Sequence, residues 1–454
     1  MPSKHYDLVV IGSGSGLNIA SAAANQLGWK VAIIEKGPLG GTCLNRGCIP
    51  SKMIIHTADI VETIQSADIF GIKASIQSMD FARIMARANN LVDEDSLRIE
   101  RNIVKHHSID LYKTTGFFTT PKTLTVGKEE ITGERIVIAA GARPFIPPIE
   151  GLEKVDYWTS TEALRQTKLP QSLVIIGGGY ISAELGHFYG AMGTKITIIE
   201  TLPSLLARED KDIAEAFTLS FSQKYEVILN AKVTHVTQDD THSKKVTYQD
   251  INGHEHTVES EALLVSVGIT PNSDTLQLEH TKVTTNPRGY ITVNPSMETT
   301  EENVWALGDI VGLAPFKHGA NYEAEIVFHN MMSKSKRKAN YSVMPHAVFT
   351  SPQIASVGLT EQQAVEQKIP HEVKKYDYMN TGMGTAIEAH QAFVKFIVDQ
   401  SEEHILGCHI IGPEASTLIH EVVVAMKAAK GKISAITDTI HIHPSLSEVI
   451  QRAL

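Results

Sequence analysis

The chain has 454 residues, 42% hydrophobic and 20% charged, which suffices for two to four domains with buried cores and argues against a disordered polypeptide. Its 51 acidic and 41 basic residues leave a formal charge of -10, which disfavours nucleic acid and anionic lipid as partners, and no apolar run approaches the ~20 residues of a membrane span. The first residues lack a signal-peptide pattern and three cysteines cannot form a disulfide framework, so we expect a reducing, cytoplasmic location.

The N-terminal segment has the pattern of a strand, a glycine-rich turn, a helix and a second strand. The apolar run 6–11, the turn Gly12-Ser-Gly-Ser-Gly16, the Ala-rich stretch 19–27 and the apolar run 31–34 follow one another. Gly12 permits a tight turn, and Gly14 lets the backbone approach a pyrophosphate at the helix N-terminus. Glu35, 23 residues after Gly12, is placed to bind a ribose hydroxyl. Leu17 occupies the position of the usual third glycine, but the order of elements predicts a dinucleotide site.

The next segment carries two cysteines close together, Cys43 and Cys48. Residues five apart on a regular helix point to different faces, so the two thiols can bridge only where the helix is distorted, which Gly47 permits. The pattern is typical of a strained, exchangeable disulfide. A zinc site is the alternative, but it requires further ligands at close spacing, and His56 alone does not complete it. We therefore expect no metal.

A second strand–turn–helix–strand pattern occupies residues 173–199. Its loop contains Gly177 and Gly179, and Glu200 again follows the first glycine by 23 residues, while Ser182 replaces the third glycine. An acidic residue at the ribose favours NAD, because the 2′-phosphate of NADP would meet a like charge. Arg208 lies eight residues beyond Glu200 and is interpreted as a charge at the start of the following helix.

The repeated pattern predicts an α/β fold with two doubly wound parallel sheets. A proline-rich run before Ile149 and the break after residues 263–267 place the boundaries of the two nucleotide-binding domains at 1–148 and 149–268. The polar, basic stretch 333–338 reads as an exposed linker rather than a nucleic-acid patch. A last domain, 341–454, has strand patterns at 392–398 and 405–411 and a helical pattern at 416–429, with no phosphate loop.

The C-terminal motif His441-Ile-His-Pro-Ser-Leu-Ser-Glu448 allows two interpretations. Ser445 and Glu448 form the S-x-x-E pattern of a capping box, which on its own favours a structural role for Glu448. The thiol pair elsewhere in the chain reverses this balance. Thiol exchange requires a thiolate, and a histidine with a carboxylate partner, here His443 with Glu448, is a usual way to supply it.

Taken together, these motifs resemble the class I pyridine nucleotide-disulfide oxidoreductases, most closely the dihydrolipoamide dehydrogenases, with the mycothione reductases also near. The resemblance covers essentially the whole chain and includes, besides Cys-Leu-Asn-Arg-Gly-Cys and the two loops, residues 138–142, 305–309, 349–352 and 441–448. It implies two Rossmann-like nucleotide-binding domains and a C-terminal α+β dimerisation domain. It also implies that residues 269–340 return to the first domain as a central region.

The resemblance further implies a place for each cofactor. FAD would be held by the first loop with Glu35 and by Asp309, and NAD by the second loop with Glu200. Lys52, paired with Glu184, would lie near the flavin ring. The other residues assigned to cofactor binding are Gly12, Gly14, Gly16, Thr42, Gly141, Gly177, Gly179, Tyr180, Gly268, His318 and Ala320.

The resemblance also implies the catalytic roles. Cys48 would face the flavin, Cys43 would exchange with substrate, and His443 with Glu448 would act as acid and base from the other chain of a homodimer. The expected activity is oxidation of dihydrolipoamide by NAD. The alternative within the class is NAD(P)H-dependent reduction of another small disulfide of the mycothione type. Ile269 replaces an arginine that many relatives carry.

Overall fold

The computed structural model describes residues 4–454, which form two compact units. The first unit combines the residues up to Ser51 with Met85–Phe145 and Gly268–Tyr341. The second combines Lys52–Ile84, Ile146–Val267 and Ser342–Leu454. Each unit is therefore built from three separate stretches of the chain.

The first unit contains a seven-stranded sheet in the order β3-β2-β1-β6-β5-β4, with β16 paired to β6. Its strands are β1 (Lys4–Ile11), β2 (Val31–Ile34), β3 (Ile109–Tyr112), β4 (Gly116–Thr120), β5 (Thr123–Val126), β6 (Glu129–Ile138) and β16 (Val304–Ala306). Strands β3, β2, β1, β6 and β16 are parallel, whereas β5 pairs antiparallel to β4 and β6. The last residues of β1, β2 and β6 lie in register, so the loops that follow them meet at one edge.

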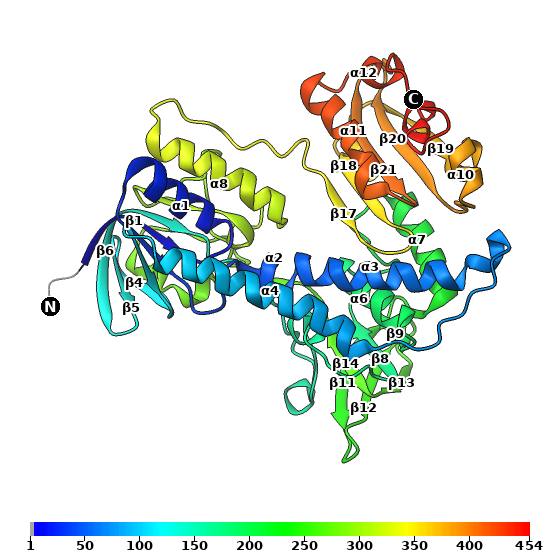
Figure 1. Ribbon diagram of the computed structural model, residues 1–454, viewed down its shortest axis with the longest axis horizontal. Helices are drawn as coiled ribbons and strands as arrows, with labels where there is room; N and C mark the ends of the chain where they lie inside the picture. Colours follow the sequence, from blue (N-terminus) through cyan, green and yellow to red (C-terminus); the bar gives the residue numbers. More distant parts are fainter. Residues whose placement is uncertain (1–3) are drawn as a thin grey trace. The chain divides into compact units, whose positions relative to one another are not determined.

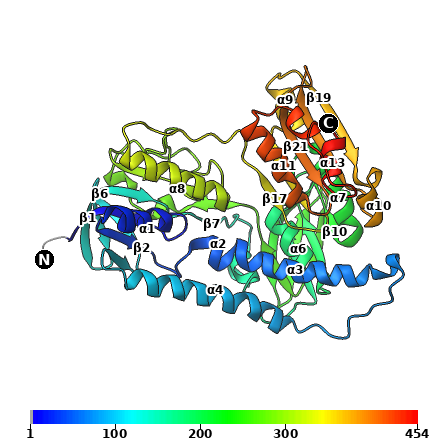
Figure 2. The same ribbon diagram turned by 45° about the horizontal axis from the view of Figure 1, so that its top comes forward.

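Three long helices belong largely to this unit: α1 (Gly16–Leu27), α4 (Phe81–Val104) and α8 (Lys317–Met332). Helices α1 and α8 lie side by side (Figures 1 and 2). Apolar side chains of the strands, of α1 and of α8 form one buried core, which includes Val10, Ile19 and Val327. Helix α1 ends at Leu27, because the following residue, Gly28, has a left-handed φ of 67°.

The second unit contains a four-stranded parallel sheet in the order β10-β9-β8-β14. Its strands are β8 (Ser172–Ile176), β9 (Lys195–Ile199), β10 (Glu226–Ile228) and β14 (Ala262–Val265). Between β10 and β14 the chain forms an antiparallel meander of β11 (Lys232–Gln238), β12 (Lys244–Gln249) and β13 (Glu255–Ser260). The helices of this part are α5 (Ser160–Ala163), α6 (Tyr180–Ala191) and α7 (Lys211–Lys224).

The C-terminal part of the second unit is a five-stranded antiparallel sheet in the order β17-β18-β21-β20-β19, with α11 packed on it (Figure 1). Its strands are β17 (His346–Val348), β18 (Ile354–Gly358), β19 (His371–Asp377), β20 (Phe393–Asp399) and β21 (Ile405–Ile411). Its helices are α9 (Glu361–Glu366), α10 (Gly382–Ala386), α11 (Ala415–Ala428), α12 (Ser434–Thr437) and α13 (Glu448–Arg452).

Shorter elements complete the chain. Helices α2 (Gly41–Arg46) and α3 (Cys48–Gln65) carry the cysteine motif, and β7 (Ala142–Pro144) pairs antiparallel with β15 (Ile269–Pro271). The 3-10 helices are η1 (Ala67–Phe70), η2 (Leu152–Lys154), η3 (Asn272–Thr275), η4 (Leu278–His280), η5 (Gly308–Ile310) and η6 (Tyr378–Asn380). Among residues 4–454, the helices are all too short or too polar to cross a bilayer.

A buried lysine links the two parts of the second unit. The ammonium of Lys395 in β20 is fully buried and lies 2.8 Å from Oδ1 of Asp210, the N-cap of α7, and 2.6 Å from Oε2 of Glu361 in α9. Burial alone would lower the pKa of Lys395, but its acidic partners raise it above its ordinary value. The charge is therefore retained inside the protein by an ion cluster that spans both sheets.

The predicted α/β class is confirmed, and both expected strand–turn–helix–strand patterns are present. The strands predicted at 31–34 and 405–411 have those bounds in the structure. The helix expected at 416–429 begins one residue earlier and ends at Ala428. The apolar run 263–267 is a strand only to Val265, because Ser266 and the residues after it leave the sheet.

Candidate functional site

The first glycine loop connects β1 to α1 at the carboxyl edge of the first sheet. Gly12 has a φ of 100°, and a Cβ there would lie 2.2 Å from the carbonyl oxygen of Ala139, so only glycine fits. The position of a Cβ on Gly14 has no atom within 4 Å. A Cβ on Gly16 would meet Cγ1 of Val10 at 2.7 Å. Gly16 therefore allows α1 to pack closely on β1. The usual third glycine of such a loop has this role, but Leu17 occupies its position here.

Glu35 follows β2 and accepts hydrogen bonds from the first glycine loop. Its Oε2 accepts hydrogen bonds from the amide of Ser13 at 3.0 Å and from Oγ of Ser13 at 2.7 Å. Its Oε1 accepts from the amide of Gly37 at 2.7 Å. A carboxylate has about four acceptor positions, so one remains for a ribose hydroxyl. The structure thus places Glu35 beside the loop, and its binding of a ribose hydroxyl stays a prediction.

Asp309 lies on η5, which follows β16, in the same unit. Burial raises the pKa of its carboxyl group, while the positive charge of Lys317 acts in the opposite direction. Ala320, one turn into α8, is buried, and its Cβ would be 3.4 Å from a Cβ on Gly308. His318 is exposed and stacks on Phe316 with a ring separation of 5.3 Å.

Sequence reasoning missed Glu323, a fully buried carboxylate on α8. Its Oε2 accepts from the amide of Gly308 at 2.6 Å, and its Oε1 accepts from the hydroxyl of Tyr341 at 2.8 Å. Burial, together with the nearby charge of Asp309, raises the pKa of Glu323 to about 7. In the sequence, only its position on the apolar side of a helix indicates that Glu323 is buried and needs hydrogen-bond donors.

These residues fit an FAD-type dinucleotide. The space beside Gly14 is open at the N-terminus of α1, where unsatisfied amides and the helix dipole favour a pyrophosphate. Glu35 offers an acceptor to the adenosine ribose, and Asp309 lies on the neighbouring turn of the same unit. Gly141 has a φ of 67°, and no atom lies within 4 Å of its Cβ position.

The two cysteines lie on either side of a helix break, as the sequence predicted. Cys43 is in α2 and Cys48 is the first residue of α3, while Gly47 between them has a non-helical conformation with φ −147° and ψ −115°. Cys43 is partly buried and Cys48 is exposed. Asn45, which sequence reasoning missed, donates from its buried amide to the carbonyl of Leu39 at 2.9 Å and fixes α2 to the preceding loop.

One turn after Cys48, Lys52 forms an ion pair within the second unit. Its ammonium lies 2.7 and 2.8 Å from the two carboxylate oxygens of Glu184 on α6, and 4.6 Å from the ring centre of Phe349. Glu184 also accepts from the amide of Phe349 at 3.1 Å. The lysine–glutamate pairing implied by the sequence resemblance is therefore present, and the motif at 349–352 contributes to it.

The second glycine loop has the geometry of the first. Gly177 has a φ of 103°, and no atom lies within 4 Å of a Cβ position on Gly179. Glu200 accepts hydrogen bonds from the amides of Gly178 and Leu202, which holds its carboxylate at the loop. Ser182, at the third glycine position, contacts Oγ of Ser266 at 2.7 Å. Two flanking residues of this region, Tyr180 and Arg208, are exposed.

The C-terminal motif forms a histidine–carboxylate pair. Nδ1 of His443 lies 3.0 and 3.1 Å from the two carboxylate oxygens of Glu448, and two-thirds of the His443 side chain is exposed. Arg452 donates to Oε1 of Glu448 at 2.7 Å, and the amide of Ser445 donates to Oε2 at 3.2 Å. The hydrogen bond with His443 is the largest cause of the lowered pKa of Glu448. Glu448 therefore caps the turn at Ser445 and also binds the ring of His443.

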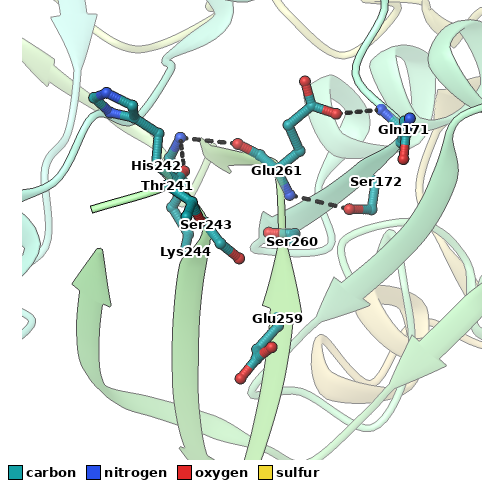
Figure 3. Close-up of a pocket in the computed structure, with 9 residues that line it drawn as sticks. All are labelled: Gln171, Ser172, Thr241, His242, Ser243, Lys244, Glu259, Ser260 and Glu261. Carbon is teal, nitrogen blue, oxygen red and sulfur yellow. Dashed lines mark hydrogen bonds between the residues drawn. The ribbon is translucent and has the colours of Figure 1, made fainter. Parts of the chain in front are cut away.

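An open depression of about 670 Å³ lies elsewhere, at the amino ends of β8 and β14 (Figure 3). It is lined by Gln171, Ser172, residues 241–244 and residues 259–261. Lys244 donates to the carbonyls of His242 and Glu261 at 2.8 Å each, and the amide of Gln171 donates to Glu261. These polar groups satisfy one another, and the glycine loop lies at the opposite edge of the sheet. The depression is therefore separate from the candidate site.

Comparisons with known proteins agree with this geometry. Residues 6–335 match the family model described as pyridine nucleotide-disulphide oxidoreductase, and residues 344–454 match the model of the dimerisation domain of the same family. Mycothione reductase from Mycobacterium tuberculosis (strain ATCC 25618 / H37Rv) is 35% identical over 460 residues, covering 99% of this chain and 98% of that protein. Dihydrolipoyl dehydrogenase from Bacillus subtilis (strain 168) is 33% identical over 465 residues, with the same coverage.

Two further relatives carry other names. Mercuric reductase from Staphylococcus aureus is 32% identical over 450 residues, covering 99% of this chain and 82% of that protein. Among solved structures, the Cu(II) complex of the HOCl-induced flavoprotein disulfide reductase RclA from Escherichia coli has a TM-score of 0.87 at 30% identity. The alignment covers 100% of this chain and 99% of that one. The relatives thus share an architecture and differ in the substrates that their names state.

Proposed function

This chain belongs to the pyridine nucleotide-disulphide oxidoreductase family, and from that premise we propose that it oxidises dihydrolipoamide with NAD by way of a Cys43–Cys48 disulfide and FAD. The observation that carries the proposal is the helix break at Gly47 between the two cysteines, in a segment that follows a dinucleotide loop. A second small-disulfide activity, reduction of a mycothione-type substrate, is favoured by the 35% identity to mycothione reductase.

In the proposed reaction His443 acts as the base. Its Nδ1 donates to the Glu448 carboxylate, so the exposed ring carries its lone pair on Nε2, which can take a proton from a substrate thiol. The substrate thiolate attacks Sγ of Cys43, and the Cys43–Cys48 bond breaks with its electron pair on Cys48. The second substrate thiol then displaces Cys43 from the mixed disulfide, leaving two reduced cysteines and an oxidised substrate.

FAD, when bound, would supply two-electron transfer between the reduced cysteine pair and NAD, and the first glycine loop with Glu35 and Asp309 would hold it. In this proposal Lys52, which follows Cys48 by one turn of α3 and is paired with Glu184, provides the positive charge that would favour a thiolate at Cys48. Glu200 is the residue that selects NAD over NADP in this proposal.

The base and the thiol are proposed to come from different chains. The match of residues 344–454 to the family's dimerisation domain supports a homodimer. The side chains of Ile440 and Ile442 alternate with the histidines of the C-terminal motif and are 97% and 77% exposed in the single chain. Large apolar residues with this exposure are typical of a surface that a second copy covers. In this proposal His443 lies at the interface between the two chains.

Reduction of the flavin and turnover of substrates test the proposal. We expect a yellow holoprotein that dihydrolipoamide bleaches without NAD, and whose colour returns when NAD is added. Rates with dihydrolipoamide and NAD are then compared with rates for NADH and mycothione, and for NADH and glutathione disulfide. Faster reduction of mycothione would replace the lipoamide assignment with the second one. Absence of bleaching by every dithiol and by NADH would contradict the whole proposal.

A further inference from the structure

Helices α1 and α8 lie side by side (Figures 1 and 2), and a lysine of α8 contacts the first glycine loop at the start of α1. Lys317 is the first residue of α8, and its ammonium donates to Oγ of Ser15 at 3.0 Å. Ser15 is the residue that precedes α1, and its hydroxyl donates in turn to Oδ1 of Asn321 at 2.9 Å. Asn18 donates to the same oxygen at 3.2 Å. The lysine is thus bound to the loop through a fixed polar network.

Lys317 lies where the protein already carries partial positive charge. The N-terminus of a helix carries a partial positive charge, and Lys317 lies at the N-terminus of α8 and contacts the residue that begins α1. Within residues 4–454, the close polar contact of its ammonium is with the hydroxyl of Ser15 and not with a carboxylate. The buried carboxyl group of Asp309 is close enough to sense this charge but does not form an ion pair with it. Two helix ends and a lysine therefore concentrate positive charge at one place.

We propose that Lys317 binds the pyrophosphate of FAD; this inference rests on the proposed placement of FAD in the first loop. An ammonium has three donors, and Ser15 takes one of them, so two remain for phosphate oxygens. The open space beside Gly14 lies in the same loop as Ser15. The pyrophosphate supplies a negatively charged partner for the two helix N-termini and the lysine. The hydrogen bonds among Lys317, Ser15 and Asn321 hold the ammonium in place.

A purely structural role for Lys317 predicts a different behaviour. If the lysine only supported Ser15, its loss would weaken the contact between α1 and α8 in the protein without cofactor and leave the affinity for FAD unchanged. If it binds phosphate, the loss of charge acts mainly on the affinity. The two roles therefore separate when stability without FAD and binding of FAD are measured on the same variants.

The test is FAD binding to the apoprotein, followed by the quenching of FAD fluorescence. We expect Lys317→Met and Lys317→Gln to raise the Kd for FAD about ten-fold to a hundred-fold, as for the loss of a charge-assisted hydrogen bond to phosphate. Lys317→Arg should retain most of the affinity because it keeps the charge. The control Lys338→Gln removes an equal charge from an exposed position of the same unit and should leave the Kd unchanged.

Two further measurements sharpen the result. The Kd of the wild-type chain should rise with ionic strength, and this dependence should be weaker in Lys317→Met. The ³¹P resonances of bound FAD should shift in Lys317→Met and not in Lys338→Gln. Equal Kd values for the wild-type and both neutral Lys317 variants would overturn the inference, and so would a lower Tm of the apoprotein with an unchanged Kd. Failure of the wild-type chain to bind FAD would instead refute the proposed function itself.

Discussion

Nε2 of His187 on α6 lies 3.0 Å from Oδ1 of Asp59 on α3. Nδ1 of the same ring lies 3.5 Å from Oε1 of Glu62, which also receives Lys224 at 2.7 Å. The histidine is fully buried. Burial alone would lower the pKa of His187, but the two carboxylates raise it above its ordinary value. A buried imidazolium therefore connects α6 to α3, three residues beyond the Lys52–Glu184 pair on α6.

We predict that this cluster makes stability fall as pH rises above about 6.5, the ordinary pKa of histidine. The pKa is raised in the folded state, so the stabilisation is complete below that pH and is lost as pH rises through the folded value. His187→Gln should cost about 3 kcal/mol at pH 6 and remove this pH dependence. The measurement is the apparent Tm of the holoprotein between pH 6 and 9. A wild-type curve parallel to that of the variant would contradict the prediction.

The groups around His187 indicate a second variant, Glu62→Gln, with which His187→Gln can be compared. Asp59 and Glu62 face the ring, and Lys224 and Tyr225 lie near Glu62. The pKa of Glu62 is lowered to about 2, despite burial, by His187 and Lys224, so its contribution is lost only on acidification below its ordinary pKa. Glu62→Gln should therefore change the acid side of the curve as well, which distinguishes the two groups.

The two cysteines of the motif should have different roles. We expect Cys43→Ser to keep a flavin that NADH can reduce but to lose turnover of dithiols at least a thousand-fold, because Sγ of Cys43 is the atom that the substrate thiolate is proposed to attack. Stopped-flow absorbance and steady-state rates measure the two effects. Cys408→Ser is the matched control: burial raises the pKa of the Cys408 thiol, which is fully buried, so its loss should leave turnover unchanged. Normal activity of Cys43→Ser would contradict the disulfide mechanism.

Cofactor choice should follow Glu200. We predict a kcat/KM for NAD(H) at least ten-fold above that for NADP(H), since the carboxylate of Glu200 repels a 2′-phosphate. Glu200→Gln should narrow this ratio, although it also weakens the hydrogen bonds to Gly178 and Leu202. Arg208→Gln is the control, because an exposed arginine that does not bind the cofactor should leave the ratio unchanged. A preference for NADPH that Arg208→Gln abolishes would assign the selectivity to the arginine.

The proposal that His443 of one chain serves Cys43 of the other can be tested by complementation. Cys43→Ser and His443→Gln should each be inactive as homodimers. Mixed under conditions of subunit exchange, they should regain activity, because a mixed dimer contains one centre with both residues intact. At full statistical exchange, half of the dimers are mixed, so about a quarter of the wild-type centres should be restored. Mixed dimers that form, as seen by native mass spectrometry, but stay inactive would place the site within one chain.

The predictability of this protein differs between its local and its long-range features. Strand and helix patterns identified both dinucleotide loops, because apolar periodicity and glycine spacing are local properties of the sequence. Gly47 likewise indicates the helix break between the cysteines, since a glycine permits the non-helical conformation found there. The role of Gly16 was not recognised, since it depends on the distance between a helix and Val10.

Buried charges were the features that sequence reasoning missed. Glu323, His187 and Lys395 are each buried, and their partners belong to other elements of the chain. A single sequence shows a polar residue in an apolar stretch but does not identify its partner, which for Lys395 is 185 residues away. Such pairs become visible only when the topology brings the segments together.

The buried ammonium of Lys395 limits how this chain can be divided. A C-terminal fragment beginning at Ser342 would keep Glu361 but would lose Asp210 and Asp212, leaving a buried charge with one acidic neighbour instead of three. Uncompensated buried charges cost several kcal/mol, a large part of the stability of a domain of this size. A chimera that exchanges C-terminal domains between relatives must therefore carry the acidic start of α7 together with β20.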